Sequence, residues 1–125
     1  MSPIEIVEEF FRRMNTNDFR WASQMLADDY VLEWPQSKER ICGGENFATV
    51  NEEYPAYGRW SFTINKIVGS TTEAVSDVSV TDGTQQARAI TFTTIRNDKI
   101  VKQIEFWPNN YEAPENRKHL VVTME

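Results

Sequence analysis

The spacing of apolar residues changes along the chain from a helical period to an alternating one. Between Ser2 and Met14, apolar side chains recur at the spacing of an amphipathic helix. Ser2, Pro3 and Glu5 form a helix start: the Ser side chain can cap, Pro sits where a missing N–H is harmless, and Glu completes a capping box. The pattern predicts a helix that begins at Ser2–Glu5 and ends near Met14.

Two more helices and a short strand are predicted before residue 56. Residues 15–18 break the first helix and can cap a second, which runs through Leu26 and ends at Asp28. Alternation from Tyr30 to Trp34 then indicates a strand that Pro35 stops. A third helix is expected to start at Gly43–Gly44 and to end before Pro55.

From Arg59 onward the apolar period is two, which is typical of strands that bury one face. The segments "RWSFTINKIV", "EAVSDVSVT", "TQQARAITFTTIR" and "KIVKQIEFW" read as four strands. Asp82-Gly83 and Asn97-Asp98 separate the last three, and Asp-Gly is a strong hairpin signal. Helices followed by an antiparallel meander predict an α+β domain.

Size and charge restrict the partners. The 125 residues fit one domain spanning 1–125, and the net charge of −6 argues against nucleic acid or an anionic membrane surface. No apolar stretch approaches the roughly 20 residues of a membrane span, and no signal-peptide pattern begins the chain. The single cysteine excludes an internal disulfide, so we expect a cytoplasmic protein.

Turn geometry suggests which strand residues face one another. If both turns are two-residue loops, Asp77 lies opposite Arg88, and Ile90 lies opposite Glu105. Asp77, Arg88 and Glu105 would then share one sheet face, with Arg88 between two carboxylates. This cluster is either an acid/base catalytic group or a structural ion pair. A bulge in either hairpin would break the inference.

The opposite face is predicted to be small and apolar, and it would carry Ala89, Thr91, Ile104 and Phe106. A sheet that is apolar on both faces needs two covers. The three helices can cover one face. We therefore expect a second subunit on the other face, in a twofold homodimer.

The pattern resembles the SnoaL-like family of the nuclear transport factor 2-like superfamily. The matching features are the capped first helix, "ADDYVLEWPQSKERICGGENF", "ITFTTIRNDKIVKQIEFW" and "YEAP". The resemblance implies a cone: a curved antiparallel sheet whose concave face holds the N-terminal helices and a pocket. It also implies a dimer through the convex sheet face. Family members include ketosteroid isomerases, polyketide cyclases, epoxide hydrolases and noncatalytic binders.

The same resemblance bears on individual residues. Trp34 stands where ketosteroid isomerases carry a proton-shuttling Asp, and Phe10 stands where they carry an oxyanion-binding Tyr; their second donor falls near Ile90 or Thr91. A Trp cannot move a proton at neutral pH, so Trp34 is expected to be a pocket wall. Glu105 resembles the position of a carboxylate in limonene-type epoxide hydrolases. Asp77 and Arg88 do not match that family's arrangement.

Two functions remain open at this stage. One is an acid/base enzyme, of isomerase, cyclase or hydrolase type, that acts on a hydrophobic molecule through Asp77, Arg88 and Glu105. The other is a noncatalytic binding module of the same fold. Neither needs a metal or an organic cofactor. In both, we expect aromatic side chains to contact the ligand: Phe10, Tyr30, Trp34, Tyr54, Trp60, Phe92 and Trp107.

Overall fold

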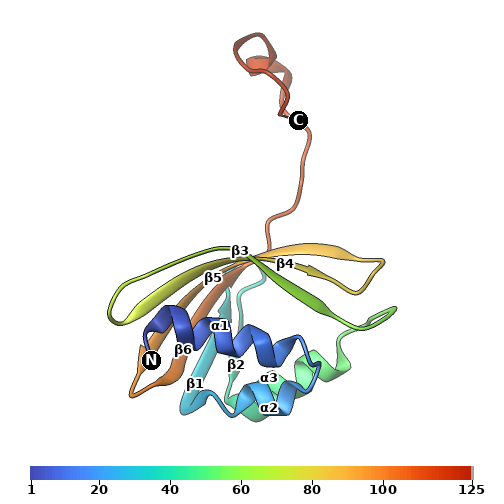
Figure 1. The fold of residues 1–125 in the computed structure, drawn as a ribbon. Helices are drawn as coiled ribbons and strands as arrows, with labels where there is room; N and C mark the ends of the chain where they lie inside the picture. The colour runs from blue at the N-terminus through green and yellow to red at the C-terminus, as the bar shows by residue number, and fades with distance from the viewer. Residues whose placement is uncertain (125) are drawn as a thin grey trace.

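Three helices pack into the concave face of a six-stranded curved sheet, as Figure 1 shows for the computed structural model of the chain. The structure describes residues 1–124. The helices are α1 (Pro3–Met14), α2 (Phe19–Ser23) and α3 (Gly44–Glu53), and a 3₁₀ helix, η1, spans Glu115–Leu120. The strands are β1 (Leu26–Trp34), β2 (Glu39–Cys42), β3 (Ser61–Gly69), β4 (Glu73–Thr81), β5 (Gln86–Arg96) and β6 (Lys99–Phe106). The predicted α+β cone is confirmed.

The first helix forms as the sequence predicts. The Glu5 backbone N–H donates to Ser2 Oγ at 3.2 Å, and the Ser2 N–H donates to Glu5 Oε1 at 2.9 Å, which completes the capping box. The apolar side of α1, from Ile6 to Met14, is buried against the sheet. This packing makes α1 the main cover of β3 and β4.

The second helix is shorter than predicted. It ends at Ser23, and Leu26 already begins β1. Met25 and Leu26 are buried, as the helical pattern required, but their partner is β6: the Ile100 N–H donates to the Met25 carbonyl at 2.9 Å. A short apolar run buries the same side chains as helix or as strand, so spacing alone could not separate the two.

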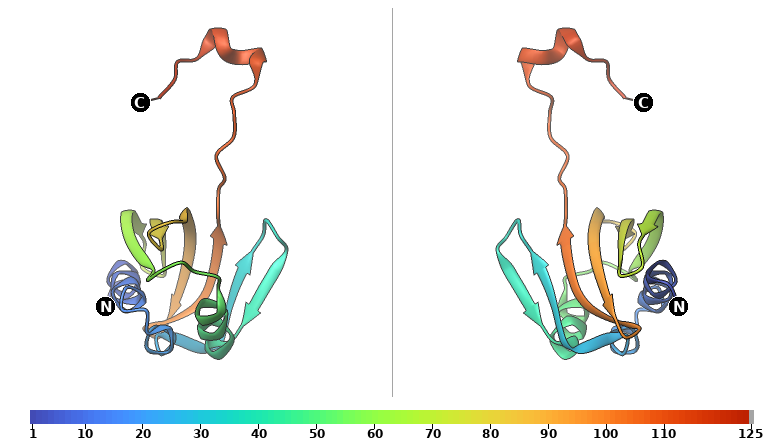
Figure 2. Two further views of the ribbon diagram at one scale, coloured as in Figure 1. Left: turned by 90° about the vertical axis from the view of Figure 1, so that its right-hand side faces the viewer. Right: turned by 90° about the vertical axis from the view of Figure 1, so that its left-hand side faces the viewer.

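The sheet order is β2-β1-β6-β5-β4-β3, so the two halves of the chain meet where β1 lies beside β6. That pair is parallel, whereas every other neighbouring pair is antiparallel. Figure 2 shows the sheet curving around the helices and remaining unclosed between β3 and β2. β2, which the sequence pattern did not reveal, forms one edge of the sheet.

The predicted strand registers are wrong at both hairpins. Between β4 and β5 the loop contains four residues, 82–85, because Thr81 pairs with Gln86; Asp77 therefore lies opposite Ile90. Between β5 and β6, Arg96 does pair with Lys99, as predicted. The next pairs are Ile95 with Ile100 and Thr94 with Lys102, so Val101 is an extra residue in β6.

The bulge at Val101 moves Glu105 to the other face of the sheet. Glu105 pairs with Thr91, which is fully buried on the concave face, and not with Ile90. Arg88 and Asp77 lie on the convex face, where Arg88 is 59% exposed. The predicted cluster of Asp77, Arg88 and Glu105 therefore does not form.

The predicted second apolar face is corrected for the same reason. Ala89 and Thr91 are buried under the helices, whereas Ile104 pairs with Phe92, which is 47% exposed. The convex face thus combines Ile104 and Phe106 with residues that were assigned to the opposite side. Phe92 and Phe106 form an edge-to-face pair there, with ring centroids 6.3 Å apart.

The chain leaves the cone after Trp107. It extends away from the sheet and carries η1 beyond the body of the domain, as both figures show. The apolar side chains at its end remain exposed, including Leu120 at 75% and Val122 at 90%. This segment therefore does not pack as a further sheet edge.

The observed strand registers predict how removal of the Asp77–Arg88 ion pair on the convex face changes the free energy of unfolding. Arg88 Nε donates to Asp77 Oδ1 at 2.7 Å, but water reaches the pair and screens it. Arg88→Met should leave the free energy of unfolding unchanged within the error of a urea titration. Thr91→Val should cost about 1–3 kcal/mol, because it removes a buried donor to a carboxylate. An Arg88→Met loss as large as that of Thr91→Val would contradict this placement of the pair.

Candidate functional site

A cavity of about 540 Å³ opens at the end of the cone from which the C-terminal segment leaves. Its size lies within the range of small-molecule sites. We call it the aromatic cavity, because aromatic rings contribute to it from β1, β3, the end of α3 and the end of β6. Its lining comprises Trp34, Gln36, Ser37, Glu39, Val50, Asn51, Tyr54, Trp60, Phe62, Val80, Gln85, Gln86, Ala87, Trp107 and Asn109.

Two asparagines fix the wall formed by Trp60 and Phe62. Asn17 accepts from the Trp60 N–H at 2.9 Å and donates to the Trp60 carbonyl at 2.8 Å. Asn15 does the same for Phe62, at 2.7 and 2.8 Å. These side-chain amides bond to backbone N–H and C=O groups at the edge of β3, as the backbone of a neighbouring strand would. The Asn17 backbone has a φ of 64°, a left-handed conformation that Asn tolerates better than most residues.

Asp82 joins the loop before β3 to the loop between β4 and β5, which contributes Gln85 to the lining. Its carboxylate accepts hydrogen bonds from the backbone N–H groups of Tyr57, Thr84 and Gln85, at 2.7–2.9 Å. These bonds hold the pKa of Asp82 far below its usual range. Gly58 lies against the same residue: a Cβ there would come within 2.7 Å of the Asp82 carbonyl oxygen. The sequence suggested only a turn at Asp82-Gly83.

Glu105 is a half-buried carboxylate that bonds to the aromatic wall. Thr91 Oγ1 donates to Glu105 Oε2 at 2.6 Å, and Trp34 Nε1 donates to Glu105 Oε1 at 3.0 Å. Burial raises the pKa of Glu105, while hydrogen bonds from Thr91, Trp34 and Trp107 oppose the rise. The Trp34 side chain therefore has two roles. Its ring lines the cavity, and its N–H donates a hydrogen bond to the Glu105 carboxyl group.

A second polar chain runs beside the first, through Thr93 and Gln103, which lie two residues from Thr91 and Glu105 on the same strands, and through Tyr30 of β1. The Tyr30 hydroxyl donates to Gln103 Oε1 at 2.6 Å, and Gln103 Nε2 donates to Thr93 Oγ1 at 3.3 Å. All three residues are buried, and burial raises the pKa of Tyr30 well above its usual value. Tyr30 is therefore a neutral hydrogen-bond donor in the interior.

The structure brings together some of the predicted ligand contacts and separates others. Trp34, Tyr54, Trp60 and Trp107 line the aromatic cavity. Phe10 and Tyr30 lie in the core, 2% and 1% exposed, and are absent from the lining. Phe92 is on the convex face. Of the three residues predicted to be catalytic, Glu105 alone points toward the interior.

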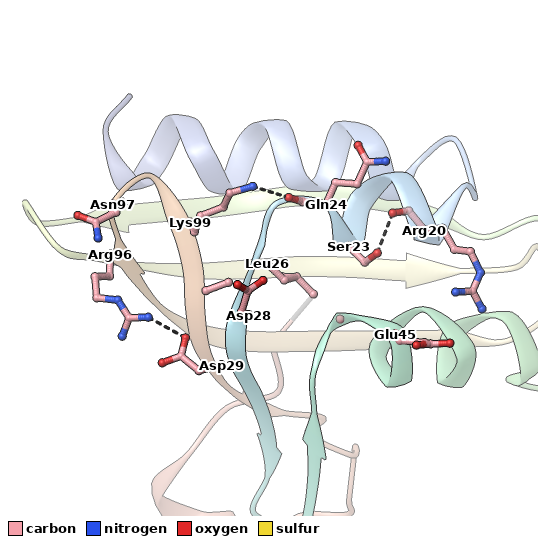
Figure 3. A pocket seen from close by; sticks show the side chains of 12 residues that line it. Arg20, Ser23, Gln24, Leu26, Asp28, Asp29, Glu45, Arg96, Asn97 and Lys99 are labelled. Carbon is pink, nitrogen blue, oxygen red and sulfur yellow. Dashed lines mark hydrogen bonds and ion pairs between the residues drawn. The ribbon is translucent and has the colours of Figure 1, made fainter.

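A second, wider depression lies at the other end of the cone, between α2, the start of β1 and the β5–β6 turn (Figure 3). Its volume of about 1040 Å³ is larger, but it is more open to solvent and is lined by charged groups. Arg96 pairs with Asp29 at 2.7 Å, and Lys99 Nζ donates to the Gln24 carbonyl at 2.7 Å. We therefore place the candidate site in the aromatic cavity, which is more enclosed and more apolar.

The described residues contain neither a candidate metal site nor a candidate membrane-spanning helix. Within residues 1–124, no group of three or more His, Cys, Asp and Glu side chains is arranged to hold a metal ion. Over the same residues, no helix is both long and apolar enough to cross a membrane.

Comparison with known proteins places the chain in a family. A model of the SnoaL-like domain matches residues 7–103, so the chain belongs to the SnoaL-like family. No curated protein sequence matches it significantly.

Solved structures share the fold. A ketosteroid isomerase candidate from Kribbella flavida is 28% identical with a TM-score of 0.88, over 97% of this chain and 88% of that one. An LEH-like epoxide hydrolase from M. tuberculosis is 21% identical with a TM-score of 0.66, over 85% and 82%. A hypothetical protein with a ketosteroid isomerase-like fold from Catenulispora acidiphila, solved in complex with trimethylamine, is 13% identical with a TM-score of 0.70, over 84% of this chain and 85% of that one.

The environment of Glu105 predicts a specific pH dependence. Because burial raises its pKa above 4.5, the folded state holds a proton that the unfolded state releases. Glu105 therefore makes the folded state less stable as pH rises from about 4.5 through the raised pKa. Glu105→Gln removes this effect, and Thr91 can reorient its hydroxyl to accept from the new amide.

The measurement is urea unfolding of both proteins from pH 4 to pH 8. The free energy of unfolding of the variant, relative to the parent, should increase with pH and then level off. The control is Glu45→Gln, the same chemical change at an exposed position on α3. A relative stability of Glu105→Gln that falls with rising pH would contradict a raised pKa.

Proposed function

We propose that the protein binds a small hydrophobic organic molecule in the aromatic cavity. The observation that carries this proposal is the lining itself: five aromatic side chains from four parts of the chain converge on one cavity of ligand size. The side chains are Trp34, Tyr54, Trp60, Phe62 and Trp107. Polar residues anchor three of these walls: Asn17 holds Trp60, Glu105 holds Trp34, and Gln36 accepts from the Trp107 backbone N–H at 2.6 Å.

Binding without turnover is the function that the geometry favours. Asp77 and Arg88 point away from the cavity, so they cannot assist a reaction in it. Glu105 lies behind the indole of Trp34 and is not part of the lining. A ligand in the aromatic cavity would touch the ring before it reached the carboxyl group.

An acid/base enzyme is the second candidate, and one observation favours it. Burial moves the pKa of Glu105 upward, toward the range in which a carboxyl group can exchange protons near neutral pH. For Glu105 to act in this way, Trp34 would have to move aside when substrate binds.

A ligand screen with two variants separates these functions. Small aromatic and polycyclic compounds would be titrated against the protein, with binding followed by calorimetry. Trp34→Phe keeps a ring but loses the N–H, so it should weaken the best ligand several-fold. Trp21→Phe is the matched control: Trp21 packs against Arg12 and Arg13, outside the cavity, and its replacement should leave affinity unchanged.

Any compound that binds would then be tested for turnover. If the protein is a noncatalytic binding module, the compound will be recovered chemically unchanged. Turnover that disappears in Glu105→Gln while affinity persists would establish the enzyme instead. Equal affinity losses in Trp34→Phe and Trp21→Phe would place the ligand outside the aromatic cavity.

We also propose a homodimer through the convex face. Val68 and Phe92 are 51% and 47% exposed there, and Ile90, Ile104 and Phe106 lie beside them, half-buried. A contiguous apolar patch of this kind is typical of an interface, and twofold pairing is the commonest arrangement.

The proposed dimer can be tested by introducing a charged side chain at the centre of this patch. Ile104→Lys should give a monomer in sedimentation velocity, because two lysines would meet across the twofold axis. Thr71→Lys, in the exposed β3–β4 turn, adds the same charge and should leave the dimer intact. A dimer that survives Ile104→Lys would rule out this interface.

A further inference from the structure

The lining of the aromatic cavity includes an acidic side chain but no basic one among its described residues. Among its described residues none is Lys, Arg or His, and one, Glu39, is a carboxylate. A second carboxyl group, Glu105, accepts a hydrogen bond from Nε1 of Trp34, which is part of the lining. The charged side chain of the lining and the carboxyl group bonded to Trp34 are therefore both acidic.

The basic residues next to the lining in sequence are directed elsewhere. Arg40 follows Glu39 but pairs with Glu33 at 2.6 Å. Arg88 follows Ala87 but pairs with Asp77 on the convex face. Arg59 precedes Trp60, and its Nη2 donates to the Asn15 carbonyl at 2.9 Å. Lys38 is exposed in the turn between β1 and β2 and does not line the cavity.

The aromatic walls add an attraction for positive charge. The rings of Tyr54 and Trp60 meet at 70°, with centroids 5.9 Å apart, so they form two sides of a corner. Aromatic faces carry partial negative charge and attract a cation held over them. An anion in the same place would lose its water without gaining a positive partner, which is costly.

We infer that the aromatic cavity prefers a ligand with an alkylated ammonium group on an apolar skeleton over neutral or anionic ligands of similar shape. This inference rests on the proposed function and specifies its ligand class. Alkyl groups suit this site because they spread the charge over a large, weakly hydrated surface that can touch several rings at once. Glu39 at the rim complements the charge from outside.

The preference can be measured with three compounds built on a benzyl skeleton. Benzyltrimethylammonium is the cation, neopentylbenzene its neutral isostere, and phenylacetate the anion. Each is titrated into nitrogen-labelled full-length protein, and the indole N–H signals of the four tryptophans are followed by NMR. Signals of Trp34, Trp60 and Trp107 should shift, whereas that of Trp21, which is outside the cavity, should not.

The cation should bind roughly fivefold more tightly than the neutral isostere, as expected for partly exposed cation–π contacts. Phenylacetate should bind more weakly than both. The order should persist at high salt, because contact with the rings is screened less than long-range attraction to the net charge. Equal affinity of cation and isostere, or tightest binding of phenylacetate, would overturn the inference and leave the proposed binding function standing.

A ring-removing variant tests the mechanism of the preference. Tyr54 is 54% exposed, so Tyr54→Leu should fold normally. It should reduce the advantage of the cation while changing the affinity of neopentylbenzene by less than about twofold. Tyr57→Leu, at a more exposed tyrosine outside the lining, should change neither affinity.

Two further outcomes are decisive. An equal loss for both ligands in Tyr54→Leu would mean that the ring contributes only apolar area, and this would overturn the inference. If none of the three compounds shifts a cavity tryptophan, the proposed function fails together with its ligand class.

Discussion

The extra residue in β6 determines which side of the sheet every later side chain of that strand faces. Side chains alternate along a strand, so inserting Val101 between two paired residues turns Glu105 inward and Ile104 outward. Without the bulge, Glu105 would lie beside Arg88 in solvent. With it, a carboxyl group reaches the interior, receives Thr91 and Trp34 as donors, and aligns one wall of the cavity.

This bulge also explains how far sequence reasoning succeeded. The α+β class and the capped first helix follow from patterns carried by several residues at once, whereas the cone and the position of Trp34 in a cavity wall were implied by the family resemblance. The cluster at Arg88 depended on the registers of two hairpins, and one extra residue within β6 was enough to reverse a face. Val101 has no residue-level signature of a bulge. The four-residue loop was equally hidden, because Asp82-Gly83 has the composition of a tight turn while Asp82 is in fact buried and bonded to three backbone N–H groups.

Polar side chains, more than apolar packing, position the walls of the cavity. Asn15 and Asn17 hold β3, Asp82 holds the loop before it, and Glu105 holds the Trp34 ring. Each is a short or buried side chain with both partners in reach, so little conformational freedom is lost in forming these bonds. The aromatic rings can then present their faces to the cavity, since their backbone or N–H groups are already satisfied elsewhere.

The two asparagines that bond to the edge of β3, Asn15 and Asn17, have a consequence for strand addition at high protein concentration. An unclosed sheet has two edges, and an edge with free N–H and C=O groups invites strand addition by a neighbouring chain. At Trp60 and Phe62, those groups are already occupied by side-chain amides. The other edge, β2, is only four residues long and carries Glu39 and Arg40. At these positions both sheet edges thus offer a neighbouring chain few places to add a strand, although the sheet is not closed into a barrel.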